Sequence, residues 1–236
     1  MNVLITGHSR GLGEALADIY LGRGDGVFGV SRTPLQREHG SLTQVSADLC
    51  ATATIDAALK LLFTTRDGPD LVFLNAGILG PIAALNDTDV ATLQRIMDVN
   101  VWANKLILDW LVQRPRRPQQ IIAISSGASV SGNFGWGPYA MSKASLNMLI
   151  RLYAHELPDT HLTALAPGLI DTDMQSQIRT VSAVEFPSLQ RLHDAQGSES
   201  MPPAQVAAEQ ICQCLEALKT LPSGDFIDLR KQFPIP

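Results

Sequence analysis

The sequence predicts an α/β fold: a doubly wound, seven-stranded, mostly parallel sheet with helices on both faces. Short apolar runs alternate with longer amphipathic stretches, which is typical of strand–helix–strand units. Several runs are apolar on both faces, as expected for strands covered by helices on both sides. The chain has 236 residues, of which 45% are hydrophobic and 17% charged, so we expect residues 1–236 to form a single domain with a full core.

The expected elements follow one another regularly along most of the chain. The expected strands are 2–6, 26–31, 43–47, 70–75, 120–125, 161–166 and 225–229. The expected helices lie near 12–23, 53–66, 88–113, 138–157 and 203–219. The segment 171–202 breaks the alternation, because it is long, polar and mixed and follows a strand end. Since ligands bind outside the carboxyl ends of strands in open α/β sheets, we expect this segment to form a substrate lid or wall.

The composition argues against several classes of partner. The net charge of −5 gives no reason to expect a nucleic-acid partner, and the basic run RPRRP (114–118) is expected to be a solvated loop. No apolar run approaches the roughly 20 residues that a membrane span needs. The three cysteines indicate neither a zinc site nor a disulfide framework, and we expect no bound metal. This cysteine usage suits a reducing compartment, so we expect the protein to be cytoplasmic.

The glycine-rich stretch TGHSRGLG follows the first expected strand and opens the first expected helix. Its glycines allow a tight turn and close approach to a pyrophosphate, while the helix behind it offers free N–H groups. This context predicts a dinucleotide site of the Rossmann type, although three residues separate the first two glycines. The alternative is a plain strand–helix turn. The loop residues expected to contact the cofactor are Gly7, Ser9, Arg10, Gly11, Leu12 and Gly13.

The end of the second strand indicates which dinucleotide binds. A carboxylate there would bind the 2′-hydroxyl of NAD, whereas an arginine would receive the 2′-phosphate of NADP. The residues are VSRTP, with Arg32 and no acid, and Arg10 adds a second cation. The two arginines predict NADP(H), because guanidinium–phosphate pairs are charge-assisted; the alternative is that both are ordinary surface charges. Further cofactor contacts are expected at Asp48, Leu49, Asn75, Ala76 and Gly77.

Tyr139 and Lys143 lie four residues apart on an expected helix and therefore share a face. A nearby ammonium favours the phenolate, so the tyrosine is expected to give or take a proton near neutral pH. Carbonyl reduction needs such a proton, and the lysine can also hold the nicotinamide ribose. The serines of ISSG (124–127) end the fifth strand, where a hydroxyl can bond a substrate oxygen. Taken alone, the pair also fits a surface position; the glycine loop and the serines favour catalysis.

The motifs TGHSRGLG, NAG, MDVN, ISS, YAMSK and PGLIDTDM occur in an order that resembles the short-chain dehydrogenase/reductase family over essentially the whole chain. The family's serine precedes the tyrosine by thirteen positions, which selects Ser126 over Ser125. The resemblance implies that Asn100 holds a water in a proton relay through Lys143. It also implies a homodimer or homotetramer that pairs through the long helices. The residues implied to contact the cofactor are Tyr139, Lys143, Pro167, Gly168, Ile170 and Thr172.

A narrower resemblance, carried by FGWGPY, SKASLNM and APGLIDTDMQSQIR, is to the sepiapterin reductase and benzil reductase branch. It implies an NADPH-dependent reductase of vicinal dicarbonyl compounds, with a small-molecule carbonyl substrate. Asp228 is the implied substrate anchor, and Met174 is an expected lid contact. Trp136 is expected either to line the substrate pocket with Phe134 or to pack the loop. The alternatives are a dehydrogenase or ketone reductase of another substrate class, or a non-catalytic NADP(H) sensor on the same fold.

Overall fold

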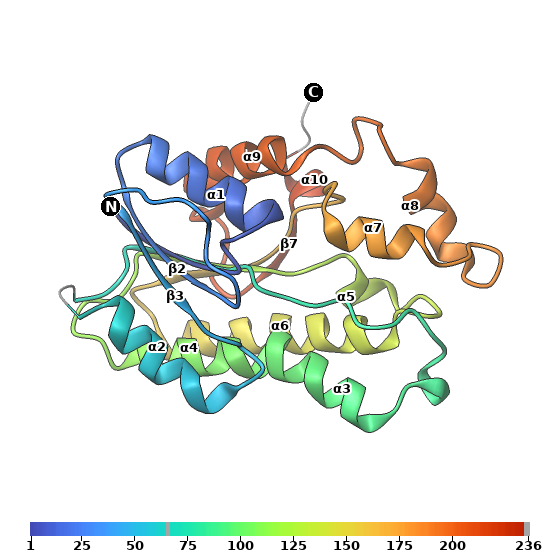
Figure 1. The fold of residues 1–236 in the computed structure, drawn as a ribbon, viewed down its shortest axis with the longest axis horizontal. Coiled ribbons are helices and arrows are strands. Elements are labelled where there is room, and N and C mark those ends of the chain that lie inside the picture. Colours follow the sequence, from blue (N-terminus) through green and yellow to red (C-terminus); the bar gives the residue numbers. More distant parts are fainter. Residues whose placement is uncertain (65–66, 234–236) are drawn as a thin grey trace.

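A computed structural model describes residues 1–64 and 67–233. Within them, seven strands form one sheet in the order β3-β2-β1-β4-β5-β6-β7, and all six pairings are parallel (Figure 1). The predicted doubly wound α/β fold is therefore confirmed. The strands are β1 (Asn2–Thr6), β2 (Gly26–Ser31), β3 (Leu42–Ser46), β4 (Leu71–Leu74), β5 (Gln120–Ile124), β6 (His161–Ala166) and β7 (Phe226–Asp228).

Helices cover both faces of the sheet (Figure 1). On one face lie α1 (Gly11–Gly22) and α9 (Ala204–Leu218). On the other lie α2 (Ile55–Leu62), α4 (Ala103–Val112) and α6 (Gly137–Glu156). A hydrophobic core lies on each face of the sheet, and alternate residues of β1 pack into one or the other. Leu4 packs on the α6 side, while Val3 and Ile5 pack on the α1 side. This explains why the strand is apolar at every one of these positions.

Two predicted helices differ from the observed ones. The helix expected at 53–66 begins with a 3₁₀ turn, η1 (Thr52–Thr54), before α2, and the end of the prediction at 65–66 lies outside the described residues. The helix expected at 88–113 follows η2 (Leu85–Asp87) and consists of α3 (Val90–Met97), the π-helical turn η3 (Asp98–Trp102) and α4. Hydrophobic periodicity did not reveal this interruption, because the apolar stripe continues through it.

The segment 171–202 folds into short helices that lie over one end of the sheet. They are α7 (Asp173–Arg179), the 3₁₀ turn η4 (Pro187–Leu189) and α8 (Gln190–Asp194). Its ends meet where the Asp171 N–H donates to the carbonyl oxygen of Pro202 at 3.0 Å. Two further short helices, α5 (Ala128–Ser131) and α10 (Leu229–Gln232), were not expected from the sequence. Among the described helices, none is both long enough and apolar enough to cross a membrane.

Candidate active site

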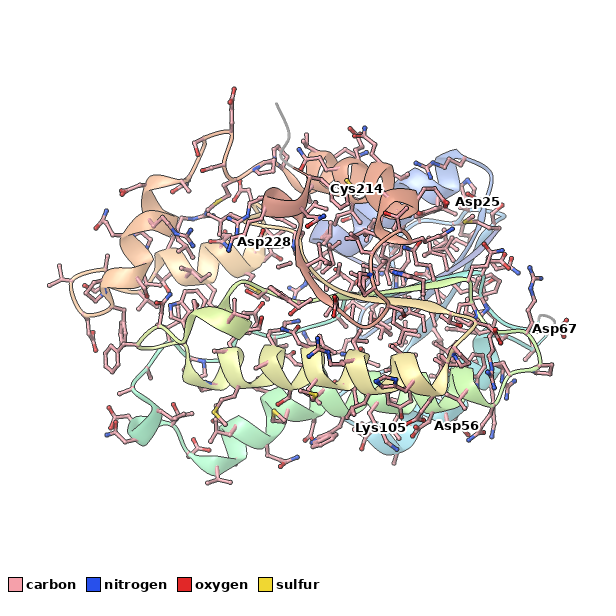
Figure 2. The ribbon with its side chains drawn as sticks, turned by 180° about the vertical axis from the view of Figure 1, so that it is seen from behind. Asp25, Asp56, Asp67, Lys105, Cys214 and Asp228 are labelled. Carbon is pink, nitrogen blue, oxygen red and sulfur yellow. The ribbon has the colours of Figure 1, made fainter. Side chains whose placement is uncertain are left out.

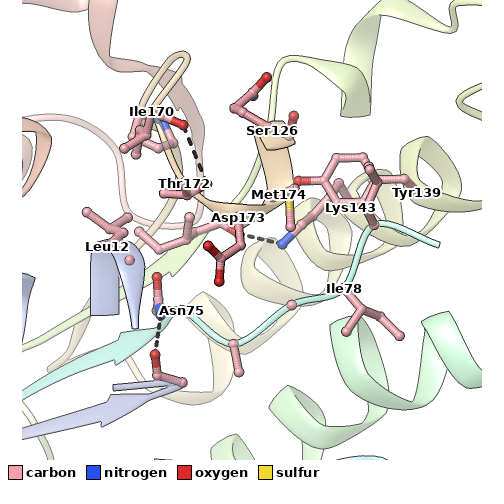
Figure 3. Close-up of a pocket in the computed structure, with 18 of the residues that line it drawn as sticks. Leu12, Asn75, Ile78, Ser126, Tyr139, Lys143, Ile170, Thr172, Asp173 and Met174 are labelled. Carbon is pink, nitrogen blue, oxygen red and sulfur yellow. Dashed lines mark hydrogen bonds between the residues drawn. The ribbon is translucent and has the colours of Figure 1, made fainter. Parts of the chain in front are cut away.

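A cleft of about 1200 Å³ opens at the carboxyl ends of the strands, the edge where open α/β sheets bind ligands (Figure 3). The glycine loop, the turns that follow β2 to β5 and the segment after β6 line it. All but three of the site residues expected from the sequence line this cleft. The exceptions are Gly13 and Asn100, which support its wall from behind, and Phe134, which is exposed outside it.

The glycine loop has a shape that only glycine allows. Gly7 and Gly11 have φ angles of +68° and +54°, in the left-handed region. A Cβ on Gly13 would overlap the carbonyl oxygen of Gly7, so α1 packs against the loop only because Gly13 lacks a side chain. Asn75 Nδ2 holds the loop by donating to the carbonyl oxygens of Thr6 and Gly7 at 3.0 and 3.2 Å. Among the residues that the structure describes, no side chain caps the N-terminus of α1, so its first N–H groups suit a phosphate.

Two arginines stand at the nucleotide end of the cleft. The side chain of Arg32 forms no ion pair among the described residues. Arg32 is the first residue after β2, so no carboxylate stands at that position. Arg10 Nη1 lies 3.3 Å from Asp173 Oδ2, with both side chains largely exposed. Asp48 uses its Oδ1 to accept from the Cys50 N–H at 3.0 Å, while Leu49 is buried. This end of the cleft thus carries two cationic side chains, one of which is paired with a carboxylate.

The Tyr139–Lys143 pair is buried at the start of α6. Lys143 Nζ lies 5.7 Å from the centroid of the Tyr139 ring, and only 3% of Lys143 is exposed. Burial raises the pKa of Tyr139 to about 12, against an opposing effect of the Ser126 hydroxyl, and burial lowers the pKa of Lys143 to about 8. The lowering of the tyrosine pKa that was expected from the lysine is therefore not found: desolvation raises this pKa, and Ser126 is the group that opposes the rise. Tyr139 is protonated at neutral pH, which is the form that donates a proton.

The two serines after β5 have different surroundings. Ser125 Oγ donates to Asn147 Oδ1 at 2.5 Å, and only 3% of Ser125 is exposed. Ser126 Oγ accepts from the Ala128 N–H at 3.1 Å and is the serine that acts on the Tyr139 hydroxyl. Because a hydrogen bond from the Ser126 hydroxyl acts to lower the pKa of Tyr139, the two hydroxyls lie close enough to reach the same substrate oxygen.

Asn100 occupies the centre of the π-helical turn η3 and is fully buried. Its Oδ1 accepts from the Ile78 N–H at 2.8 Å, and its Nδ2 donates to the Ile78 carbonyl oxygen and to Ser142 Oγ, both at 2.9 Å. Both amide hydrogens are thus in use. A Cβ on Gly77 would lie 3.3 Å from Asn100 Oδ1 and from Lys143 Nζ alike, so both groups lie beside Gly77. The Asn100 side chain thus links the loop after β4, at Ile78, to α6, at Ser142.

The segment 171–202 contributes an apolar wall beside Tyr139. Trp136 Nε1 donates to Ser188 Oγ at 3.0 Å, and the rings of Trp136 and Tyr139 have centroids 6.3 Å apart. Phe186 lies against Gly135 and stacks on Phe134 with centroids 5.4 Å apart. Met174 packs at the edge of the same group (Figure 3). The buried apolar residues of this wall are Leu79, Trp136, Tyr139, Ile178, Phe186, Leu189 and Leu192.

Asp228 lies at the end of β7 (Figure 2). Its side chain lines the cleft. Its carboxylate already has partners: Oδ1 accepts from the Arg230 N–H at 3.2 Å and from Nε at 3.1 Å, and Oδ2 accepts from Nη2 at 3.0 Å. The stem of Arg230 covers Gly168, where an added Cβ would lie 2.8 Å from Arg230 Cδ. Gly168 also has a φ of +97°. Both this backbone conformation and the contact with Arg230 therefore require glycine at this position.

The family model for short chain dehydrogenases matches residues 1–182. The chain belongs to the short-chain dehydrogenase family. This membership confirms the resemblance drawn from the motifs and, with the relatives below, makes the protein an oxidoreductase of CH–OH or C=O groups. The family works with a nicotinamide cofactor, NAD or NADP, on small molecules.

Similar proteins place this short-chain dehydrogenase in the expected branch. It is 29% identical over 239 residues to the benzil reductase ((S)-benzoin forming) of Bacillus subtilis (strain 168), covering 97% of this chain and 98% of the relative. It is 30% identical over 249 residues to the sepiapterin reductase of Xenopus tropicalis, covering 95% and 94% of the two chains. The crystal structure of the KRED1-Pglu enzyme superposes with a TM-score of 0.85 at 29% identity, covering 96% of this chain and 99% of that one.

Several cleft residues of this short-chain dehydrogenase were missed from the sequence. Gln175 is only 9% exposed and lines the cleft, and no side chain or backbone group among the described residues bonds its amide. Ser188 lies in the short 3₁₀ turn η4 and Leu79 in the loop after β4, and the composition of neither segment carries a signal. Arg230 follows a strand end, but its pairing with Asp228 depends on how α10 turns. Packing between distant segments sets the positions of Gln175, Ser188 and Leu79, whereas Arg230 is held by a residue two positions away.

Proposed function

We propose that this short-chain dehydrogenase is an NADPH-dependent carbonyl reductase that transfers hydride to one carbonyl of a vicinal dicarbonyl or related small ketone. The observation that supports this most is the convergence of Ser126, Tyr139 and Lys143 on the cleft that also holds the glycine loop. A reductase needs a proton donor and a carbonyl-binding hydroxyl within one water-poor pocket beside the cofactor.

The proposed mechanism assigns one role to each polar group. The bound nicotinamide supplies the hydride. Ser126 donates a hydrogen bond to the substrate carbonyl oxygen, which polarises the carbonyl. Tyr139 delivers its phenolic proton to that oxygen. Lys143, anchored on the Ile124 carbonyl oxygen at 2.7 Å, stabilises the phenolate that forms and orients the ribose. Asn100 is the proposed support of a proton relay to Lys143 from behind the cleft wall.

NADPH is favoured by the charges at the nucleotide end. Arg32 stands where an NAD-specific site would carry a carboxylate, and Arg10 reaches the same region from the glycine loop. Arg32 makes no ion pair among the described residues, so its charge is available to a phosphate. The remaining proposed contacts are Gly7, Ser9, Gly11, Leu12, Asp48, Leu49, Asn75, Ala76, Gly77, Pro167, Gly168, Ile170 and Thr172, with Gly13 shaping the loop from behind.

The substrate class is supported by the wall beside Tyr139. We propose that 171–202 forms this wall and that Trp136 and Met174 contact the substrate. An apolar, aromatic pocket suits a neutral diketone, whose adjacent carbonyls withdraw electron density from each other. Asp228 is already paired with Arg230, which favours such a compound over a pterin that would need a free carboxylate. Pterin reduction remains a second candidate because of the similarity to sepiapterin reductase.

The decisive assay follows the loss of NADPH absorbance with benzil, sepiapterin and simple monoketones. We expect fast turnover of benzil. Turnover of monoketones alone would leave a ketone reductase of another substrate class and remove the dicarbonyl assignment. NADPH binding without turnover of any compound would favour a non-catalytic sensor.

We further propose a homodimer or homotetramer that pairs through α4 and α6 in the cytoplasm. Met141, Met148 and Leu152 form an exposed apolar row on α6, at 49%, 53% and 53% exposure. Such a row is more typical of an interface than of a solvated helix. All three cysteines are free thiols, which suits a reducing compartment. Sedimentation equilibrium on the wild type and on Met148→Lys tests the pairing.

A further inference from the structure

The backbone of residues 32–36, which follows β2 and carries Arg32, is held by side chains from two strands. Ser46 Oγ donates to the carbonyl oxygen of Arg32 at 2.7 Å, and Ser31 Oγ donates to that of Thr33 at 2.8 Å. All five residues of the segment line the cleft. The segment is therefore fixed before any ligand binds, which lowers the ordering cost of binding.

Gln44 on β3 provides two further attachments, both to Leu35. Its Nε2 donates to the carbonyl oxygen of Leu35 at 3.1 Å, and its Oε1 accepts from the Leu35 N–H at 2.9 Å. The two bonds use both backbone groups of one residue, as a neighbouring strand would. They also determine which end of the amide is oxygen, because a backbone N–H requires an acceptor.

His8, from the glycine loop, bonds to the same amide oxygen. Its Nε2 lies 2.8 Å from Gln44 Oε1, and since that oxygen can only accept, Nε2 carries the hydrogen. The ring is fully buried and lies on Gly29 of β2, where an added Cβ would be 2.5 Å from three ring atoms. Burial lowers the pKa of His8, so the neutral, Nε2-protonated ring persists at neutral pH. The bond to Gln44 thus gives the imidazole one orientation.

These contacts connect two parts of the cleft that bind different phosphates in the proposed complex. The glycine loop, from which His8 comes, suits the pyrophosphate, and the Gly7 N–H also bonds the Val30 carbonyl oxygen at 2.7 Å. Residues 32–36 bring Arg32 to the ribose. We propose that His8 and Gln44 are positioning residues that hold Arg32 at the 2′-phosphate, and so determine the preference for NADPH over NADH. This inference rests on the proposed use of NADPH.

The test measures equilibrium dissociation constants by calorimetry, without turnover. Gln44→Met keeps the length of the side chain, and His8→Phe keeps the ring on Gly29. In both variants the Kd of NADPH should rise about tenfold while the Kd of NADH stays within twofold, since only the 2′-phosphate contact depends on Arg32. Thr43→Val, an exposed neighbour on β3, is the matched control and should keep the wild-type ratio.

A double-mutant cycle separates positioning from general damage. Arg32→Ala should weaken NADPH binding about tenfold in the wild type and by less than threefold in Gln44→Met, because the arginine is already displaced there. Equal losses for NADPH and NADH, or full additivity with Arg32→Ala, would overturn the inference and leave the proposed function intact. A wild type that binds NADH as tightly as NADPH would instead overturn the proposed cofactor and this inference with it. If Gln44→Met does not fold, His8→Phe carries the same test.

Discussion

Lys143 Nζ donates a 2.7 Å hydrogen bond to the carbonyl oxygen of Ile124, the last residue of β5. The next two residues in the chain are Ser125 and Ser126. One bond therefore ties the buried ammonium of α6 to the strand end that carries the proposed carbonyl-binding hydroxyl. Because a buried ammonium without a partner is costly, this bond also holds α6 in register with β5.

Tyr139→Phe should lower kcat with benzil by about 10³-fold, since positioned proton donors contribute about 10²–10⁴. NADPH should still bind with a Kd within threefold of the wild type, because the ring remains. Stopped-flow absorbance and calorimetry measure the two quantities. Tyr153→Phe is the control. Tyr153 lies on the same helix but donates its hydroxyl to Asp109, so the enzyme that carries this substitution should keep the wild-type kcat. A Tyr139→Phe enzyme with wild-type kcat would remove the proposed proton donor.

The stability of the protein should depend on pH through Lys143. Its folded pKa of about 8 lies below the ordinary value of 10.5, so between these pH values the unfolded chain binds more protons. The contribution of Lys143 to the free energy of unfolding must then increase as the pH rises from about 8 to 10.5. From pH 7 to 9, the wild type should gain about 1 kcal/mol relative to Lys143→Met, as one pKa unit corresponds to about 1.4 kcal/mol. Urea unfolding of both proteins at the two pH values measures the difference. If wild type and Lys143→Met differ in stability by the same amount at pH 7 and pH 9, the Lys143 ammonium is effectively solvated.

Asp173→Asn should tighten NADPH binding by two- to threefold and leave NADH binding unchanged. Asp173 pairs with Arg10 across the mouth of the cleft, and removing its charge frees the arginine for the ribose phosphate. The effect is small because both groups are exposed. Asp171→Asn, which removes a similar pair with Arg179, is the control. Equal effects of both substitutions would assign the change to net charge alone.

Two substitutions in α1 should have opposite effects. Gly13→Ala places a methyl group against the Gly7 carbonyl oxygen and Asn75 Nδ2, so it should abolish measurable NADPH binding and lower Tm. Gly22→Ala meets no atom within 4 Å and sits at the end of the same helix, so it should stabilise the protein by about 0.5–1 kcal/mol. Calorimetric unfolding and NADPH titration measure both. Tolerance of alanine at 13 would contradict the observed loop geometry.

Trp136→Phe should loosen the segment 171–202, because it keeps an aromatic ring but loses the donor to Ser188. We expect faster amide hydrogen exchange in α8 and a several-fold higher KM for benzil. Ser188→Ala removes the same bond from the other side and should give the same result. If the two variants differ, the tryptophan acts through its ring and not through the hydrogen bond.

Much of the fold was predictable from local sequence. The seven strands were found within one or two residues of their ends, because buried parallel strands leave continuous apolar runs. The glycine loop and the spacing of Tyr139 and Lys143 were also readable, since both depend on residues that are neighbours along the chain. The interruption of 88–113 by η3 was not, because it depends on the bonds between Asn100 and Ile78.

The sequence by itself thus determined the sheet, the side of it that binds ligands and the chemical groups available there. Tertiary structure alone decided how those groups are restrained. It made Tyr139 a weaker acid through burial, joined Trp136 to Ser188 and joined His8 to Gln44. The physical reason is the same in each case. A motif reports contacts within one turn or loop, whereas desolvation and long-range hydrogen bonds depend on segments that meet only when the chain has folded.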